Sequence, residues 1–330
     1  MAATTTTSVP NAGPVSGSRS FLRKLREGDE IARIITFIFA STVVLVTLLL
    51  VFELWHGSTL ARHKFGLGFF VTSAWDPNAD DFGALPFIYG TLVTAFVSLA
   101  IAVPLGIGAA IFLAELAPQK ISDTLQFFID LLAAVPSVIY GLLGVFIIVP
   151  IMREYIQPFL KSTLGFLPLF SGPAYGIGFF TAGIVLAIMV IPYIVSVSRE
   201  VLLSVPRDQR EAALALGSTR WESTWKVVVP FARTGIMGSI FLALARALGE
   251  TMAVTMVIGN TPTISASLFS PGYSIAAVIA NEFSEATGDL YLQALIELGL
   301  VLFILTFILN GLARLLIVLT AQRGSEMGRT

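Results

Sequence analysis

An arginine and a glutamate interrupt a long apolar stretch of the sequence, "FLALARALGETMAV". They are Arg246 and Glu250. Insertion scales put the cost of a charged side chain at the centre of a membrane helix at roughly 2.5–3.5 kcal/mol, so something must compensate both charges. Residues four apart on a continuous helix lie about 40° around the axis from each other. We therefore expect the two side chains to share a face, where they can form an ion pair.

The pair has two possible uses, a salt bridge between helices or a contact with a passing anion. A buried salt bridge is a weak stabilising device, because removing both ions from water can cost more than their attraction returns. Arginine suits an anion pathway, since its planar fork binds phosphate oxygens in a bidentate manner and keeps its charge. We assign Arg246 and Glu250 to a substrate pathway, with Glu250 competing for the guanidinium so that the anion can be released.

The composition is that of an integral membrane protein. Of 330 residues, 55% are hydrophobic and only 12% are charged, outside the range of ordinary globular domains. The net charge of −1 gives no field that would attract nucleic acid. The chain has no cysteine, and its two histidines, His56 and His63, have no carboxylate at ligand spacing. We therefore expect no metal site and no thiol chemistry.

Six apolar stretches are long enough to cross a bilayer, which takes roughly 20 residues as a helix. The sequence thus predicts an all-α integral membrane protein with six transmembrane helices, at residues 31–54, 88–113, 131–151, 176–198, 235–259 and 292–319. Residues 31–320 form the predicted transmembrane domain. Residues 1–30 are expected to be a disordered cytoplasmic tail with a basic flank, and residues 321–330 a cytoplasmic C-terminal tail.

The basic residues predict the orientation. With six spans, fifteen of the twenty basic residues fall on the side of the termini, four fall on the other side, and Arg246 lies within a span. Cytoplasmic loops carry the excess of Lys and Arg, so both termini are predicted to be cytoplasmic in a multi-pass protein of the cell membrane. Three acids near predicted span ends, Glu115, Asp130 and Glu297, are expected to be solvated by water there.

Two loops are long enough to have structure of their own. The outer loop, at about 55–87, contains Trp75 and can cover or receive something outside the cell. The inner loop, at about 199–234, is the most basic part of the chain. Its first helix is predicted to begin at Asp208, with Glu211 as the partner in a capping box, and to end at Gly217.

A second helix is predicted to follow Gly217 in the inner loop. Thr219 and Glu222 have the spacing of a capping box, and Trp221 and Trp225 share a face. Pro230 is expected to end the helix. Such a helical hairpin can be gripped in a groove of another protein. It can equally lie on the anionic inner leaflet as a basic amphipathic element. The residues alone leave both possibilities open.

The inner loop resembles the cytoplasmic signature of bacterial ABC importer permeases. The residues that match this EAA-type pattern are Glu211, Ala212, Ala213, Gly217, Val227, Val229 and Pro230. The family usually has isoleucine and leucine at the two valine positions, a change that keeps the apolar character. The resemblance implies a type I ABC importer permease fold, in which this hairpin docks in a groove of a cytoplasmic ATPase.

A wider resemblance points to one branch of that family. The segments "AAVPSVIYGLLG", "IPYIVSVSREVLLSVP" and "ARALGETMAVTMVIGN" look like PstC-type permeases of phosphate-specific transport, and the likeness covers the chain from about residue 65 to the last span. It implies import of inorganic phosphate by alternating access. The implied partners are a second, PstA-like permease, a homodimeric PstB-like ATPase that binds ATP and Mg, and an external PstS-like phosphate-binding protein. In phosphate permeases, the arginine and the glutamate at the matching positions are associated with transport itself.

The chain itself carries no nucleotide-binding loop. None of its five lysines follows a glycine, so the Gly-Lys-Ser/Thr core of an ATP site is missing. We expect a permease without catalytic activity and without a cofactor of its own. The alternatives are a permease for another oxyanion or small solute, and a secondary transporter that works alone. A secondary transporter would have charges spread over several spans and no structured coupling loop. A membrane enzyme would need a cluster of reactive side chains, and we find none.

Overall fold

The computed structural model describes residues 29–327, with side chains for residues 30–315. The predicted N-terminal tail up to residue 28 and the last three residues lie outside the described residues. The chain divides into two units, Met1–His56 and Gly57–Thr330, which are considered separately. The described part of the first unit is a single long apolar helix, α2 (Asp29–Gly57), whose last residue opens the second unit.

The second unit is a helical bundle with one two-stranded β-hairpin. Its helices and strands are α3 (Thr59–Phe65), β1 (Trp75–Asp76), β2 (Asp81–Phe82), α4 (Leu85–Ile111), α5 (Gln119–Ala133), α6 (Ser137–Leu143), α7 (Val149–Ile151), α8 (Gln157–Leu164), α9 (Phe179–Leu203), α10 (Arg207–Ala215), α11 (Arg220–Ser223), α12 (Val229–Leu248), α13 (Met252–Ile258), α14 (Ile275–Glu282) and α15 (Asp289–Met327). Shorter turns are η1 (Gly66–Phe70), η2 (Phe112–Leu116), η3 (Gly144–Ile148), η4 (Met152–Ile156), η5 (Pro168–Phe170) and η6 (Thr224–Val228).

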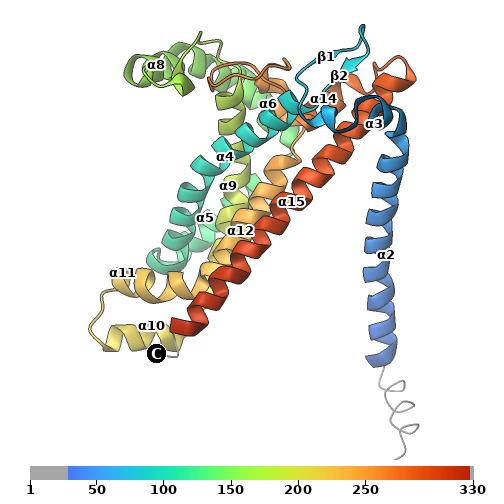
Figure 1. The fold of residues 1–330 in the computed structure, drawn as a ribbon. Helices are drawn as coiled ribbons and strands as arrows, with labels where there is room; N and C mark the ends of the chain where they lie inside the picture. The colour runs from blue at the N-terminus through green and yellow to red at the C-terminus, as the bar shows by residue number, and fades with distance from the viewer. Residues whose placement is uncertain (1–28, 328–330) are drawn as a thin grey trace, which may run out of the picture. The chain divides into compact units, whose positions relative to one another are not determined.

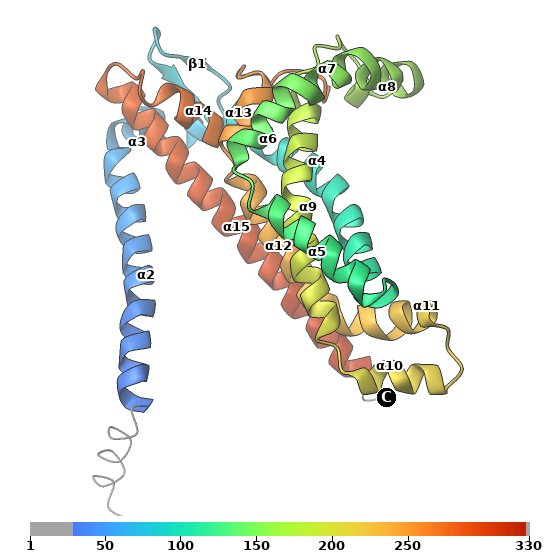
Figure 2. The same ribbon diagram turned by 180° about the vertical axis from the view of Figure 1, so that it is seen from behind.

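Six helical runs in the described residues are long and apolar enough to cross a membrane, as the sequence predicts. Within the second unit, α10 and α11 lie at one end of the bundle, which we call the hairpin end (Figures 1 and 2). The β-hairpin, α14 and α8 lie at the opposite end, which we call the loop end.

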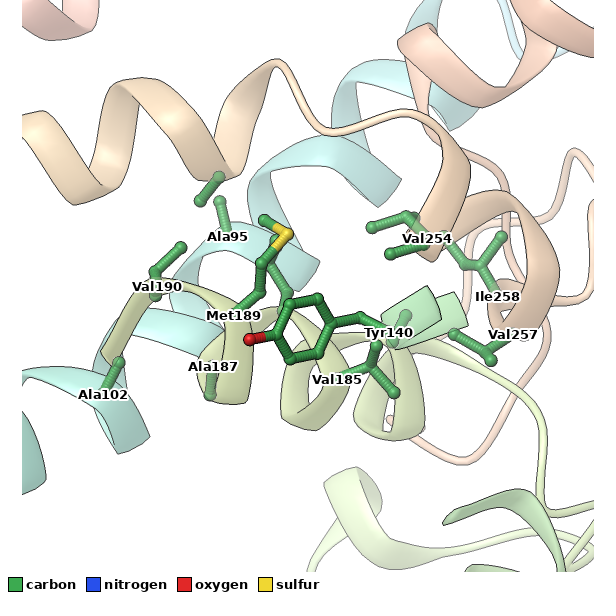
Figure 3. Packing of buried hydrophobic residues seen from close by; sticks show 14 of the residues in the cluster. Ala95, Ala102, Tyr140, Val185, Ala187, Met189, Val190, Val254, Val257 and Ile258 are labelled. Carbon is green, nitrogen blue, oxygen red and sulfur yellow. The ribbon is translucent and has the colours of Figure 1, made fainter. Parts of the chain in front are cut away.

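The centre of the bundle is the packing of α4 and α12 against α9. Glycines bring α4 and α9 close together: a methyl group on Gly106 would lie 2.7 Å from Ile194, and one on Gly183 would lie 2.4 Å from Val97. Figure 3 shows the middle of this core, where Met189 of α9 lies beside the ring of Tyr140 of α6. The helices of the second unit therefore pack around α9.

Two of the predicted spans are broken. Residues 131–133 belong to α5, the chain is non-helical at 134–136, and α6 starts at Ser137. In the fifth span, α12 ends at Leu248 and α13 starts at Met252. The continuous spans predicted at 131–151 and 235–259 are corrected accordingly. Pro136 has no N–H, so it cannot donate the hydrogen bond that would continue α5. It takes the N-cap position of α6, where no N–H is needed.

Prolines also explain four wide π-turns in the described residues. Each π-turn ends two residues before a proline, and these prolines are Pro118, Pro150, Pro158 and Pro230. A proline ring clashes with the carbonyl four residues earlier in an α-helix, and a wider turn relieves that clash. The prediction that Pro230 ends the second hairpin helix is therefore wrong, because α11, η6 and α12 are continuous through it.

The predicted outer loop is largely structured. Trp75 packs edge-on against Phe82 and Phe87, with ring centroids 4.9 and 4.7 Å apart. Its indole N–H donates to Glu282 of α14 at 2.8 Å, and the hydroxyl of Tyr291 of α15 donates to the same carboxylate oxygen at 2.7 Å. One acid thus holds the β-hairpin and α15 together at the loop end.

Because α4 and α9 approach closely, one added methyl group between them should lower the stability of the protein. Gly183→Ala should lower the Tm of the purified complex by several degrees, because the new methyl would overlap Val97 and overpacking costs about 1–3 kcal/mol. Gly238→Ala in α12 is the matched control, since nothing lies within 4 Å of its added methyl. Equal Tm values for the two variants would contradict this account of the core.

Candidate functional site

Arg246 lies half-buried near the end of α12, beside the break that precedes α13. Its guanidinium carbon is 4.4 Å from the centre of the Tyr193 ring of α9. A cation over an aromatic face is attracted by the ring quadrupole, and the attraction grows when water is excluded. The Nε of Arg246 is buried and has no hydrogen-bond partner. The side chain is thus held by stacking, with donor capacity left unused.

Glu250 does not pair with Arg246. The helix ends at Leu248, so Glu250 lies in the break and the expected shared helical face does not exist. Its Oε1 instead accepts a hydrogen bond from the backbone N–H of Ala253 at 3.1 Å, in the first turn of α13. A carboxylate is favoured there by the free N–H groups and the positive end of the helix dipole. The predicted direct pair is therefore corrected to a helix cap.

Tyr193 connects the two breaks. Its ring carries the guanidinium at the end of α12, and its hydroxyl donates to the carbonyl of Ala133, the last residue of α5, at 3.0 Å. The hydroxyl of Tyr140 donates to the neighbouring carbonyl of Leu132 at 2.7 Å. The last carbonyls of a helix have no partner within it. The Tyr193 hydroxyl thus supplies a donor to the Ala133 carbonyl, and the Tyr140 hydroxyl adds a second donor to the Leu132 carbonyl, which also accepts from the N–H of Val135.

Asp130 lies beside this polar region and makes hydrogen bonds within it. It lies one turn before the end of α5, and its Oδ1 accepts from Ser196 at 2.8 Å and from Gln126 at 2.7 Å. Ser196 is three residues after Tyr193 on α9, so the two share a face. Asp130 is exposed, which agrees with the expected solvation, and it is also hydrogen-bonded to α9, because α5 packs against that helix. In the sequence, the only indication of this polar region is the spacing of Tyr193 and Ser196, which places both on one face of an apolar helix.

Glu297 was expected to reach water and does not. Its side chain is 2% exposed, and one of its carboxylate oxygens is buried without a hydrogen-bond partner. The helices α3 and α14 pack against α15 at the loop end. This acid is therefore part of the packed interior of the second unit.

The inner loop forms the predicted helical hairpin at the hairpin end of the bundle. The first helix, α10, begins after Pro206, so Asp208 lies in the first turn and is not the N-cap. A proline is well placed at the start of a helix, where its missing N–H is not needed. Glu211 and Ala212 are exposed, whereas Ala213 is buried. Gly217 has φ of +88°, as predicted for the left-handed end of the helix.

The second hairpin helix has the predicted capping box. The N–H of Glu222 donates to Thr219 at 3.2 Å, and the N–H of Thr219 donates back to the Glu222 carboxylate at 3.0 Å. The rings of Trp221 and Trp225 are 5.5 Å apart on one exposed face. Leu216 at the hairpin tip is 89% exposed. The remaining signature residues, Val227 and Val229, are half-buried, and Pro230 is exposed.

Glu115 is paired and is not simply solvated. It lies in the π-turn that follows α4, and its Oε1 is 2.7 Å from Nη2 of Arg210 in α10. The side chains of Arg210 and Glu115 are 19% and 10% exposed. The two residues are 95 positions apart in the sequence, so no local pattern could predict this pair.

The comparison with known proteins matches this architecture. Residues 102–319 match the family described as binding-protein-dependent transport system inner membrane component. The phosphate transport system permease protein PstC of Xylella fastidiosa is 45% identical over 323 residues, covering 97% of this chain and 99% of that protein. The PstC of Pasteurella multocida is 50% identical over 287 residues, covering 86% and 89%.

This chain belongs to the PstC family of transport permeases. The relationship extends to an archaeal protein, the probable PstC of Methanocaldococcus jannaschii, which is 37% identical over 292 residues, 87% of this chain and 92% of that one. Membership of the PstC family and the six apolar helices of the described residues identify a multi-pass membrane protein.

Solved structures show that the PstC-family chain has the type I ABC importer permease fold. A bacterial ABC transporter involved in the import of alginate matches with a TM-score of 0.55 at 17% identity, over 90% of this chain and 98% of that one. The MetNI methionine ABC transporter in an inward-facing conformation matches with a TM-score of 0.52 at 18% identity, over 71% and 94%. At such low identity the likeness concerns the fold alone.

The separation of Arg246 and Glu250 predicts independent effects on stability. In a double-mutant cycle of Arg246→Gln and Glu250→Gln, the Tm shifts of the purified complex should add to within about 1 °C, because the two side chains have different partners. The cycle of Arg210→Gln and Glu115→Gln is the positive control, since that pair is in contact. Strong non-additivity for Arg246 and Glu250 would mean that they form an ion pair after all.

Proposed function

We propose that this chain is the permease subunit of an ATP-driven importer of inorganic phosphate. The observation that carries the proposal is the position of Arg246, whose guanidinium is stacked at the meeting point of two broken helices with its Nε unpaired. The names of the PstC relatives, which are phosphate transport permeases at 45–50% identity, support phosphate as the substrate. The type I fold supports alternating access.

Arg246 acts as the anion contact of the pathway. Nε and Nη2 of a guanidinium lie side by side and donate in parallel to two oxygens of one phosphate group. The stack on Tyr193 fixes the plane of the guanidinium without using any of these donors. Glu250 is held by the N-terminus of α13, which leaves the guanidinium free for the anion. When α13 moves, Glu250 can compete for Arg246 and release the phosphate.

The hairpin of α10 and α11 is the docking element for the cytoplasmic ATPase. Its exposed Glu211, Ala212 and Leu216 present a mixed acidic and apolar surface to a groove in that partner. The ATPase is a PstB-like homodimer that binds ATP and Mg, and a PstA-like permease and an external PstS-like protein complete the transporter. Both termini are cytoplasmic in this assembly, in agreement with the distribution of basic residues.

Transport consists of rearrangements of the spans without covalent chemistry in this chain. Closure of the ATPase dimer moves the hairpins, and the bundle opens outward to receive phosphate from the external protein. Hydrolysis reverses the movement. The breaks at 134–136 and 249–251 divide two crossing segments into pieces that can move separately. A guanidinium fork fits any oxyanion with two free oxygens, so another oxyanion is the second candidate substrate.

Removal of the arginine charge should abolish transport. Arg246→Gln is expected to lower ATP-dependent phosphate uptake by reconstituted complex by about 100-fold or more, because the anion loses its only proposed cationic contact in this chain. Uptake of labelled phosphate into proteoliposomes is the measurement, with subunit co-purification as the check of assembly. Arg153→Gln removes a positive charge from an exposed position in η4 and should transport normally. Normal uptake by Arg246→Gln would refute the pathway role.

Gly217, the hairpin residue with a left-handed backbone, provides a test of whether the hairpin couples the ATPase to transport. Gly217→Pro should lower phosphate uptake by about tenfold or more, because proline cannot adopt φ of +88° and the hairpin turn must distort. Gly217→Asn is the matched variant, since asparagine tolerates this conformation, and it should retain most of the uptake. Uptake that is equal in both variants would show that the hairpin geometry does not matter for coupling.

A further inference from the structure

The hairpin can drive transport only if its movement reaches the helices at the centre of the bundle. Backbone connections lead from α10 to α9 and, through α11 and η6, to α12. No such connection leads to α4, although α4 packs along α9 and is remote from the hairpin in sequence. Movement of the hairpin can therefore reach α4 in two ways, through the packing of α4 on α9 or directly through a side-chain contact.

Arg210 of α10 makes this contact. Its Nε is 3.2 Å from both carboxylate oxygens of Glu115, and its Nη2 is 2.7 Å from one of them. Glu115 lies in the π-turn at the end of α4. The fork–fork geometry is the strongest form of a charge-assisted hydrogen bond and fixes the direction of both groups.

The same guanidinium also holds the end of α9. Nη2 donates to the carbonyl of Leu202 at 2.7 Å, and Nη1 donates to the carbonyl of Val205 at 2.5 Å. These carbonyls lie at and just beyond the C-terminal end of α9, where backbone groups lack helical partners. A single side chain thus connects the hairpin with the ends of both α4 and α9.

The surroundings of the pair allow it to break and form again. Two hollows open on either side of it, one reaching Leu203 and Arg207 and the other reaching Leu214 and Arg220. Water can enter on both sides, so the charges need not stay desolvated when they separate. The other ion pairs at this end are more exposed: the Asp123 partner of Arg199 is 61% exposed, and the Lys226 partner of Glu222 is 73% exposed. Exposed pairs of this kind contribute little.

We propose that Arg210 and Glu115 are positioning residues that transmit the movement of the docked hairpin to α4 and α9. The proposal rests on the proposed function, because it needs an ATPase that acts on the hairpin. Arg210 directly precedes Glu211, the first residue of the signature that faces the ATPase. A displacement of Glu211 by the ATPase therefore acts directly on the adjacent residue, Arg210. Neither residue touches the substrate or the nucleotide.

The test separates transport from ATP hydrolysis in the reconstituted complex. Glu115→Gln keeps the size and one acceptor oxygen of the side chain but removes its charge. Phosphate uptake should fall by about tenfold, in the range of coupling between sites, while ATP hydrolysis stays within about twofold of wild type. The number of ATP molecules used per phosphate imported should rise accordingly. Arg210→Lys keeps the charge but loses the two-pronged geometry of the guanidinium. It should also lower phosphate uptake while leaving ATP hydrolysis nearly unchanged.

Two further variants serve as controls. Asp123→Asn breaks the ion pair between α5 and Arg199 of α9, which does not include the hairpin, and it should keep the wild-type ratio of ATP to phosphate. Glu115→Asp keeps the charge and should restore part of the uptake that Glu115→Gln loses. Subunit co-purification and Tm establish that each complex is assembled.

The outcomes are distinguishable. A normal ratio of ATP to phosphate in both Glu115→Gln and Arg210→Lys would overturn the transmission role. Loss of assembly, or parallel loss of uptake and hydrolysis, in both variants would overturn it too, because the pair would then only support the fold. Failure of the wild-type complex to take up phosphate would instead overturn the proposed function.

Discussion

The structure depends on one constraint, which is that a helix broken inside a membrane must find partners for its free backbone groups within the protein. Water is not available there, and each unsatisfied group costs several kcal/mol. The break after α5 is satisfied by the hydroxyls of Tyr193 and Tyr140, and the break before α13 by the carboxylate of Glu250. One of these side chains, Tyr193, also carries the stacked guanidinium of Arg246. Fold stability and the proposed substrate contact both depend on this residue.

Local signals in the sequence predicted local structure well. The six apolar runs and the capping box of Thr219 and Glu222 need only residues within one helix or turn, and the structure contains them. The same holds for Gly217, since a left-handed helix end has its own preferred residue. The family resemblance rested on this hairpin and on the apolar segments, and the comparisons confirm it.

Contacts between distant segments could not be predicted in this way. No proline marks the break at 249–251, so the sequence predicts a continuous helix and a helical face for Glu250 that does not exist. The partners of Glu115 and Asp130, Arg210 and Ser196, lie far away in the sequence, so no local pattern predicts these contacts. Each of these cases concerns a charged residue. The hydropathy pattern places helices in the membrane but does not show which polar groups face one another.

The two indole rings at the second hairpin helix have a practical consequence. The chain has four tryptophans. Trp75 donates its N–H to Glu282 within an aromatic cluster at the loop end, whereas Trp221 and Trp225 are exposed on the hairpin and in contact with each other. Indole emission shifts to shorter wavelength when the ring leaves water. Burial of that pair against another protein therefore gives an optical signal from the hairpin itself, without any added label.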